Sequence, residues 1–173
     1  FKQLKHIVMK TTKRILVCDD DIDIINVLQT ILSNEGYHVI TANNKKEGLE
    51  KMKSEKPDLA ILDVMMTTTY EGFEFAKTIR QTPELSQIPV LLQTSIYVLE
   101  TTENDMIKMA HEFRKSMPGN ELDVLLIQNT YTNECGIDYI DENQKTHWVP
   151  VNGFIKKPVD SKRLLPQIEK LLN

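Results

Sequence analysis

Three consecutive aspartates, Asp19, Asp20 and Asp21, directly follow the apolar segment 15–18. Two like charges about 4 Å apart repel each other by roughly 4 kcal/mol at an effective dielectric constant of ~20. A chain that ends an apolar segment on such a cluster needs a positive group to offset the repulsion. Taken alone, an acidic run after a strand is more commonly a helix cap or a solvated edge. The chemistry therefore depends on which other side chains reach this point.

Three further reactive side chains follow apolar segments in the same way. Asp63 comes at the end of "LAILD", Thr94 at the end of "VLLQT" and Lys157 at the end of "GFIKK". Together with Asp19 and Asp20 they comprise carboxylates, a hydroxyl and an ammonium group. Oxygen ligands of this kind suit Mg²⁺, which accepts one or two carboxylates, keeps several waters and can also hold a phosphoryl oxygen.

The elements that must position these residues alternate between strands and helices. Apolar runs predict strands, and apolar stripes at helical spacing, such as Ile24, Leu28, Ile31 and Leu32, predict helices. Gly36 is a helix stop signal and Asp21 a helix cap. The predicted strands are 14–19, 37–42, 58–64, 88–94 and 153–157, and the predicted helices are 23–36, 44–56, 72–81 and a last one that contains Leu164, Pro166 and Leu172.

Such alternation predicts an α/β fold, a doubly wound five-stranded parallel sheet with helices on both faces. Ligands bind to these sheets outside the carboxyl ends of the strands, at the point where the strand order reverses. The five residues at the strand ends are therefore expected to meet at one edge of the sheet.

The segments "LVCDD", "LAILDVMM", "VLLQTS" and "FIKKPV" resemble, in order and strand position, the receiver domain of two-component response regulators. The resemblance covers about residues 14–95 and 153–173. It implies a flavodoxin-like sheet of order 2-1-3-4-5, similar to that of chemotaxis regulators. It also implies a histidine kinase or phosphotransfer protein as partner, with a downstream protein target that the sequence does not identify.

The resemblance also implies a role for each residue at the strand ends. Asp63 would be the phosphoacceptor, and Asp20, Asp63 and the backbone carbonyl of Met65 would bind Mg²⁺, with Asp19 acting through water. Lys157 would pair with the phosphoryl group. Thr94 and Phe154 would form the switch, in which the hydroxyl shifts to the phosphoryl group and the aromatic ring turns inward. Such a domain is not an enzyme, because it catalyses only its own phosphorylation and dephosphorylation.

The chain departs from the family pattern in two places. Receivers usually have proline four residues after the phosphorylated aspartate and glycine at the eighth position, whereas this chain has Thr67 and, at the ninth position, Gly72. In addition, the segment between Thr94 and Lys157 is far longer than the roughly 20 residues that one helix with two short connections would need. We therefore expect a receiver domain over 14–173, preceded by an extension or linker over 1–13, with an insertion at about 96–150.

The insertion has a pattern of its own. Met106, Met109, Ala110, Phe113 and Met117 lie at helical spacing, with Thr101 or Thr102 as the expected cap and Pro118 and Gly119 as the stop. "ELDVLLIQ" is strand-like, and "HWVPVNG" leads back to the last strand. Residues 95–152 hold ten acidic and four basic side chains. The insertion is either a docking surface or a structural cover for the sheet.

Other function classes fit less well. A degenerate receiver that acts as a phosphorylation-independent interaction module is the main alternative, but it would normally lack one of Asp20, Asp63, Thr94 or Lys157. A phosphatase would usually carry a second aspartate at position 65, and a flavin module would need a phosphate loop after the first strand. "HEFRKSMP" resembles a histidine kinase phosphoacceptor box, but one helix cannot form the usual dimeric bundle around His111.

Composition sets outer limits on these readings. The chain has 173 residues, 40% of them hydrophobic, and a net charge of −4, so it lacks the general basic field of a nucleic-acid-binding protein. No apolar run approaches the roughly 18 residues of a membrane span, and the two cysteines suggest neither a disulfide framework nor a zinc site. We expect a cytoplasmic protein without membrane or nucleic-acid contacts, and leave homodimerisation open.

Overall fold

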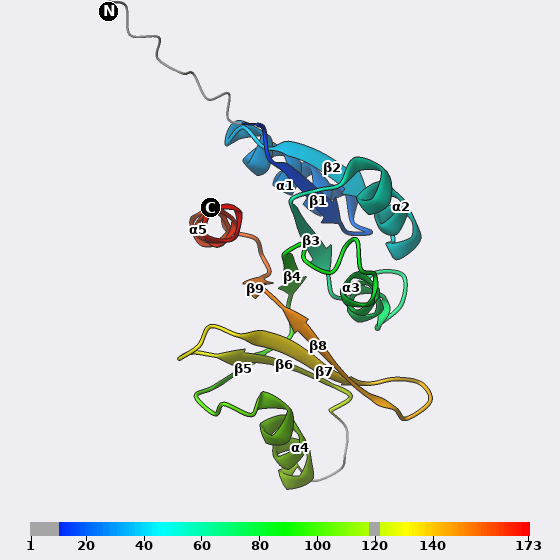
Figure 1. The fold of residues 1–173 in the computed structure, drawn as a ribbon, viewed down its shortest axis with the longest axis vertical. Coiled ribbons are helices and arrows are strands. Elements are labelled where there is room, and N and C mark those ends of the chain that lie inside the picture. Colours follow the sequence, from blue (N-terminus) through cyan, green and yellow to red (C-terminus); the bar gives the residue numbers. More distant parts are fainter. Residues whose placement is uncertain (1–10, 118–121) are drawn as a thin grey trace, which may run out of the picture.

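A computed structural model describes residues 11–117 and 122–173, and its first unit is a five-stranded parallel sheet (Figure 1). The strand order is β2-β1-β3-β4-β9, with all neighbouring strands parallel. This order confirms the predicted doubly wound fold, with β9 as its fifth strand. Its elements are β1 (Arg14–Cys18), α1 (Ile22–Asn34), β2 (His38–Ala42), α2 (Lys45–Glu55), β3 (Leu59–Asp63), α3 (Glu71–Gln81), β4 (Val90–Thr94), β9 (Gly153–Lys156) and α5 (Ser161–Leu172).

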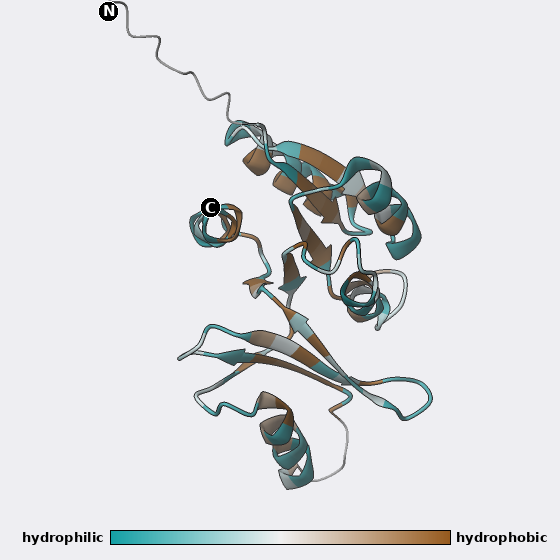
Figure 2. Cartoon of the chain, in the orientation of Figure 1, coloured by the Kyte–Doolittle hydropathy of each residue, from teal (hydrophilic) through white to brown (hydrophobic). Residues whose placement is uncertain are grey.

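Helices cover both faces of this sheet. On one face, α1 and α5 pack Leu28 and Leu164 against the strands; on the other, Met52 of α2 and Phe73 of α3 do so. All residues of β3 are buried, as expected for a strand covered on both sides. Figure 2 shows the hydrophobic colouring concentrated in these strands. Because burial of one Leu or Ile side chain contributes about 1.5–3 kcal/mol, these faces dominate the stability of the sheet.

The helix boundaries follow from local chemistry. The side chain of Asp21 accepts a hydrogen bond from the Asp23 N–H and caps α1, which confirms the predicted cap. Gly36 follows the end of α1 with a positive φ of 85°, a conformation that glycine adopts at low cost. Asn44 caps α2 in the same way as Asp21 caps α1.

The insertion forms a second sheet, which the sequence analysis did not predict. Its strands are β5 (Val98–Thr101), β6 (Val124–Asn129), β7 (Cys135–Ile140) and β8 (Thr146–Val151), in the order β5-β6-β7-β8. The predicted helix is present as α4 (Met106–Ser116), but it begins at Asp105, whose side chain accepts from the Lys108 N–H, so the expected threonine cap was wrong. The expected stop signals at 118 and 119 lie outside the described residues.

The second sheet covers the first unit and is itself covered by α4 (Figure 1). Its inner side contributes Leu126, Ile137 and Tyr139 to the same apolar cluster as Phe73 and Leu92 of the first unit. Its outer side packs Leu125 and Ile127 against Met106 and Ala110 of α4. The insertion is therefore a structural part of the core, whatever else it does.

Polar contacts fix the second sheet in place. The Arg80 side chain, at the end of α3, donates to the Pro150 carbonyl at 2.9 Å and to Asn152 Oδ1 at 2.8 Å. The hydroxyl of Tyr139, on β7, donates to Glu74 on α3. On the outer side, Arg114 pairs with the fully buried Asp138.

Within residues 11–117 and 122–173, the helices are too short or too polar to span a bilayer.

Candidate functional site

The predicted site residues meet at the carboxyl edge of the first sheet. Asp19 and Asp20 follow β1, Asp63 and Thr94 end β3 and β4, and Lys157 follows β9. The backbone ladder continues to this edge, because the Lys157 N–H donates to the Thr94 carbonyl at 2.9 Å. Parallel pairing thus brings together five side chains that are widely separated in sequence.

Three carboxylates form the centre of the site. One oxygen each of Asp19, Asp20 and Asp63 lie within 4.8 Å of one another. Asp19 and Asp63 are buried, whereas Asp20 is exposed. Burial raises the pKa of both Asp19 and Asp63 above the ordinary value, because it disfavours the charged form. The cluster therefore concentrates negative charge where water cannot fully solvate it.

Lys157 supplies positive charge to this cluster. Its Nζ lies 2.7 Å from Asp63 Oδ1 and 3.4 Å from Asp19 Oδ2. Burial of Lys157 opposes its charged form, but the hydrogen bond to Asp63 and the charges of both aspartates outweigh this effect and raise its pKa. Lys157 is therefore a charged partner held mainly by Asp63.

The carboxylate of Asp19 is held by donors on both of its oxygens. Oδ1 accepts from the backbone N–H of Asp21 at 2.9 Å, and Oδ2 accepts from Gln93 Nε2 at 3.0 Å. Gln93 was not among the predicted site residues. A signal was available, since Gln93 is a polar residue inside the apolar run "VLLQT", immediately before Thr94.

The two predicted switch residues lie on neighbouring strands. Thr94 is buried, and its Oγ1 accepts a hydrogen bond from the Ile96 N–H at 2.9 Å. Phe154, on β9, is partly buried against the cluster that the first unit shares with the second sheet. The side chain of Met65 is half exposed in the loop after β3. The proposed role of its backbone carbonyl stays a prediction.

The loop between β3 and α3 is one residue longer than in the family pattern, and contacts of Gly72 and Glu71 fix its end. A Cβ on Gly72 would lie only 2.1 Å from the Asp63 carbonyl oxygen, so α3 starts directly against the backbone of Asp63. Glu71 accepts from the backbone N–H groups of Lys45 and Thr67, each at 2.9 Å. These contacts hold the start of α3 next to Asp63 in the presence of the longer loop.

An apolar cleft of about 480 Å³ adjoins Lys157. Ile24 and Val27 of α1 line one side and Pro158 and Val159 the other. Val27 is 50% exposed, and Ile22, at the start of the same helix, is 59% exposed. An exposed apolar surface directly beside a charged site is typical of a protein-docking region.

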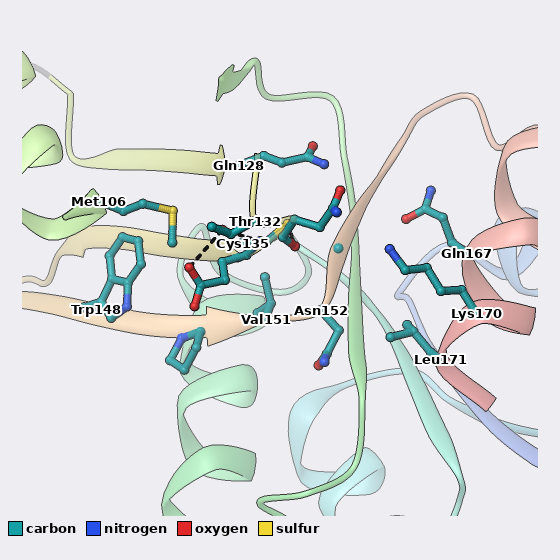
Figure 3. A pocket seen from close by; sticks show the side chains of 14 residues that line it. Met106, Gln128, Thr132, Cys135, Trp148, Val151, Asn152, Gln167, Lys170 and Leu171 are labelled. Atoms are coloured by element: carbon teal, nitrogen blue, oxygen red, sulfur yellow. Dashed lines mark hydrogen bonds between the residues drawn. The ribbon is translucent and has the colours of Figure 1, made fainter. Parts of the chain in front are cut away.

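A larger cleft, of about 630 Å³, lies away from these residues. Figure 3 shows it between Gln167 and Lys170 of α5 and the second-sheet residues Cys135 and Trp148. It borders Gly153 at the start of β9, whereas Lys157 follows the other end of that strand. The carboxylates therefore lie at the end of the sheet where the smaller cleft is, and not beside the larger one. His111 also lies away from these strand ends, on the exposed surface of α4, which packs on the outer side of the second sheet.

A receiver-type sheet with acidic residues at its carboxyl edge defines the class of protein, and sequence comparison agrees. The profile of the response regulator receiver domain family matches residues 15–113. The chain therefore belongs to this family, the receiver domains of two-component response regulators, and the resemblance noted from its motifs is confirmed.

Individual relatives support this assignment. The transcriptional regulatory protein PhoP of alkaline phosphatase synthesis in Bacillus subtilis is 43% identical over 83 residues, which make up 48% of this chain and 33% of PhoP. The match thus spans about a third of that curated relative.

Solved structures show the same fold. Chemotaxis protein CheY4 of Vibrio cholerae has a TM-score of 0.58 at 22% identity, covering 93% of this chain and 99% of that chain. The N-terminal domain of a response regulator receiver protein from Methanoculleus marisnigri has a TM-score of 0.53 at 27% identity, covering 92% and 95%.

Proposed function

We propose that this chain is a phosphorylatable receiver in which Asp63 accepts a phosphoryl group from a phosphohistidine. The observation that carries this proposal is the 2.7 Å contact between Lys157 Nζ and Asp63 Oδ1, inside a cluster of carboxylates. In the reaction, an Asp63 oxygen attacks phosphorus and a P–O bond forms. The P–N bond to the donor imidazole breaks, and the imidazole nitrogen keeps the electron pair and takes up a proton.

The residues present fit a magnesium ion. The three carboxylates offer only oxygen ligands, and ionised they carry three negative charges against one positive charge from Lys157. Asp20 and Asp63 would bind the ion directly, together with the Met65 carbonyl. Both oxygens of Asp19 already accept hydrogen bonds from the protein, which favours an indirect role through water. The bound ion would supply positive charge that offsets the charge of the transferring group.

The protein side chains have separate tasks in this proposal. Lys157 would leave its contact with the Asp63 carboxylate and stabilise the phosphoryl oxygens. The Thr94 hydroxyl uses its oxygen as an acceptor from Ile96, so its O–H is the group that would donate to the phosphoryl group. An ionised carboxylate needs no general base for this attack. The activity in this proposal is limited to phosphorylation and dephosphorylation of the domain itself.

We further propose that a histidine kinase or phosphotransfer protein docks on the apolar cleft beside Lys157. A phosphohistidine donor must approach Asp63 from the solvent side of the sheet edge. Val27, half exposed, and Ile24 line the cleft beside Lys157 and provide apolar contact area next to that approach. A downstream protein partner would then read the conformational change, and the net charge of −4 argues against nucleic-acid binding by this chain.

The test is covalent labelling with Mg²⁺ and a small phosphodonor such as acetyl phosphate. Intact-mass spectrometry at neutral pH in the cold should detect one added phosphoryl group, which Asp63→Asn should abolish. Asp123→Asn is the matched control and should be labelled normally, because Asp123 is exposed and lies just before β6 of the second sheet. Absence of labelling in the unmodified protein, or its persistence in Asp63→Asn, would instead favour the phosphorylation-independent interaction module.

A further inference from the structure

Gln93 is a polar residue at a buried strand position of the kind that apolar residues usually occupy. It lies within β4, is fully buried, and is paired in register with Asp63 on β3. Because side chains alternate along a strand, Gln93 shares its sheet face with Leu91, which belongs to the apolar cluster under α1 and α5. Asp63 continues the same face on the neighbouring strand β3, and Asp19 does so directly after β1, which lies on the other side of β3.

One half of the Gln93 amide is satisfied and the other is not. Nε2 donates to Asp19 Oδ2 at 3.0 Å, and both groups are buried. Oε1 is buried without a hydrogen-bond partner in the described part of the chain. An unsatisfied buried acceptor is destabilising, so an apolar side chain of similar shape would suit this position better if only stability mattered.

We propose that Gln93 is a positioning residue that orients Asp19 for magnesium binding. This inference rests on the proposed function. Asp21 N–H holds one oxygen of the carboxylate and Gln93 holds the other, so the two donors together fix the plane of the Asp19 side chain. A carboxylate that acts on a metal through water needs such a fixed orientation, because the water must meet both groups at once.

Gln93 also controls how Lys157 is shared between the aspartates. The amide occupies the same Asp19 oxygen that Lys157 approaches at 3.4 Å, while Lys157 lies 2.7 Å from Asp63. Without the amide, Asp19 would lose a donor and draw Lys157 toward itself. The ammonium would then be displaced from the oxygen that receives the phosphoryl group.

The experiment compares the unmodified protein with Gln93→Leu and Gln93→Met. Magnesium affinity is measured by calorimetry and by the Mg²⁺-dependent shift of the melting temperature, and labelling rates with acetyl phosphate are measured over a range of Mg²⁺ concentrations. We expect the apparent Mg²⁺ dissociation constant to rise about tenfold, as for other residues that orient metal ligands. The labelling rate should fall most at low Mg²⁺ concentration and should stay reduced to a smaller extent at saturating Mg²⁺, because the displacement of Lys157 remains.

A merely structural role gives a different result. If Gln93 only supported packing, both variants would melt at a lower temperature without Mg²⁺ and their Mg²⁺ affinity would be unchanged. Positioning predicts weaker Mg²⁺ binding in both variants whatever the melting temperature without Mg²⁺, because removal of the unsatisfied acceptor and loss of the donor to Asp19 affect stability in opposite directions. Gln128→Leu, which removes a half-buried amide from β6, is the matched control and should leave Mg²⁺ affinity unchanged.

The outcomes also separate this inference from the proposed function. An unmodified protein that binds Mg²⁺ but is never labelled would contradict the phosphoacceptor proposal, and the calorimetric comparison would still test Gln93. Equal Mg²⁺ affinity in the unmodified protein and both Gln93 variants would overturn the inference. A protein that binds no Mg²⁺ at all would overturn it as well.

Discussion

The hydroxyl oxygen of Thr94 accepts a hydrogen bond from the backbone N–H of Ile96 at 2.9 Å. Thr94 ends β4, and β5 of the second sheet begins four residues later in the chain, at Val98. Ile96 packs, partly buried, against the apolar cluster that both sheets share. A shift of the Thr94 hydroxyl toward a phosphoryl group would break this hydrogen bond. The proposed switch is therefore directly connected to the inserted sheet.

We expect phosphorylation to increase amide hydrogen exchange at Ile96 and in β5 of the unmodified protein. Thr94→Val removes the acceptor for the Ile96 N–H, so exchange there should already be fast before phosphorylation and should change little after it. Thr94→Ser keeps the hydroxyl and should behave like the unmodified protein. An equal phosphorylation-dependent change in Thr94→Val would show that the response of β5 does not depend on this hydroxyl.

Asp20→Asn should make the protein insensitive to magnesium. Asp20 is the exposed member of the carboxylate cluster, and its removal takes away one anionic ligand and part of the local repulsion. Without Mg²⁺ the variant should be more stable, by up to about 1 kcal/mol, because exposed charges interact weakly. Thermal melting with and without Mg²⁺ measures both effects. A magnesium-dependent shift equal to that of the unmodified protein would remove Asp20 from the proposed ligands.

Tyr139→Ala should strongly destabilise the whole chain. Tyr139 is fully buried, stacks on Phe73 with ring centroids 5.5 Å apart, and donates to Glu74. Loss of a buried aromatic side chain costs roughly 3–5 kcal/mol. The matched control is Tyr131→Ala, because Tyr131 is 84% exposed, and a change within about 0.5 kcal/mol is expected there. Urea unfolding gives both values.

If the second sheet folded independently of the first, Tyr139→Ala would produce two separate unfolding transitions. A single cooperative transition at lower urea concentration is the expected result.

Replacement of residues 96–150 by one short helix should abolish cooperative unfolding, because the second sheet is part of the shared core. A well-folded deletion variant would favour the docking surface as the sole role of the insertion.

The pH dependence of stability should report the buried carboxylates. The pKa of Asp63 is raised by burial, and Lys157 only partly counteracts this effect. A carboxyl group with a raised pKa binds more protons in the folded than in the unfolded chain, so its contribution to stability falls as the pH rises through the folded-state pKa. Asp63→Asn removes this contribution and should therefore lose less stability than the unmodified protein as the pH rises from the ordinary aspartate pKa of 3.8 through the raised folded-state value.

Urea unfolding over a series of pH values that spans this range, without divalent cations, measures this difference. Asp123→Asn serves again as the control and should follow the unmodified protein, since Asp123 is exposed just before β6. A steeper pH dependence in Asp63→Asn than in the unmodified protein would mean that Lys157, and not burial, dominates the titration of Asp63.

The sequence by itself determined the first sheet and the composition of its acidic edge. Apolar runs that end at Asp19, Asp63, Thr94 and Lys157 predict strands from local composition alone. Parallel topology then places every carboxyl end at one edge, so the meeting of these residues follows without any knowledge of side-chain contacts. The cap at Asp21 was predictable for the same reason, because capping depends on neighbours only two or three residues away.

Only the tertiary structure decided how the insertion folds and what holds Asp19. Strand β7 contains Gly136, a residue that weakens the strand pattern of the sequence. Glycine is needed there because a Cβ would lie only 2.2 Å from the ring of Trp148 on β8. Gln93 and Asp19 are likewise far apart in the chain, on strands separated by β3. Pairing between distant strands and contacts between buried polar groups depend on the whole packing arrangement, whereas strand and helix patterns depend mainly on neighbouring residues.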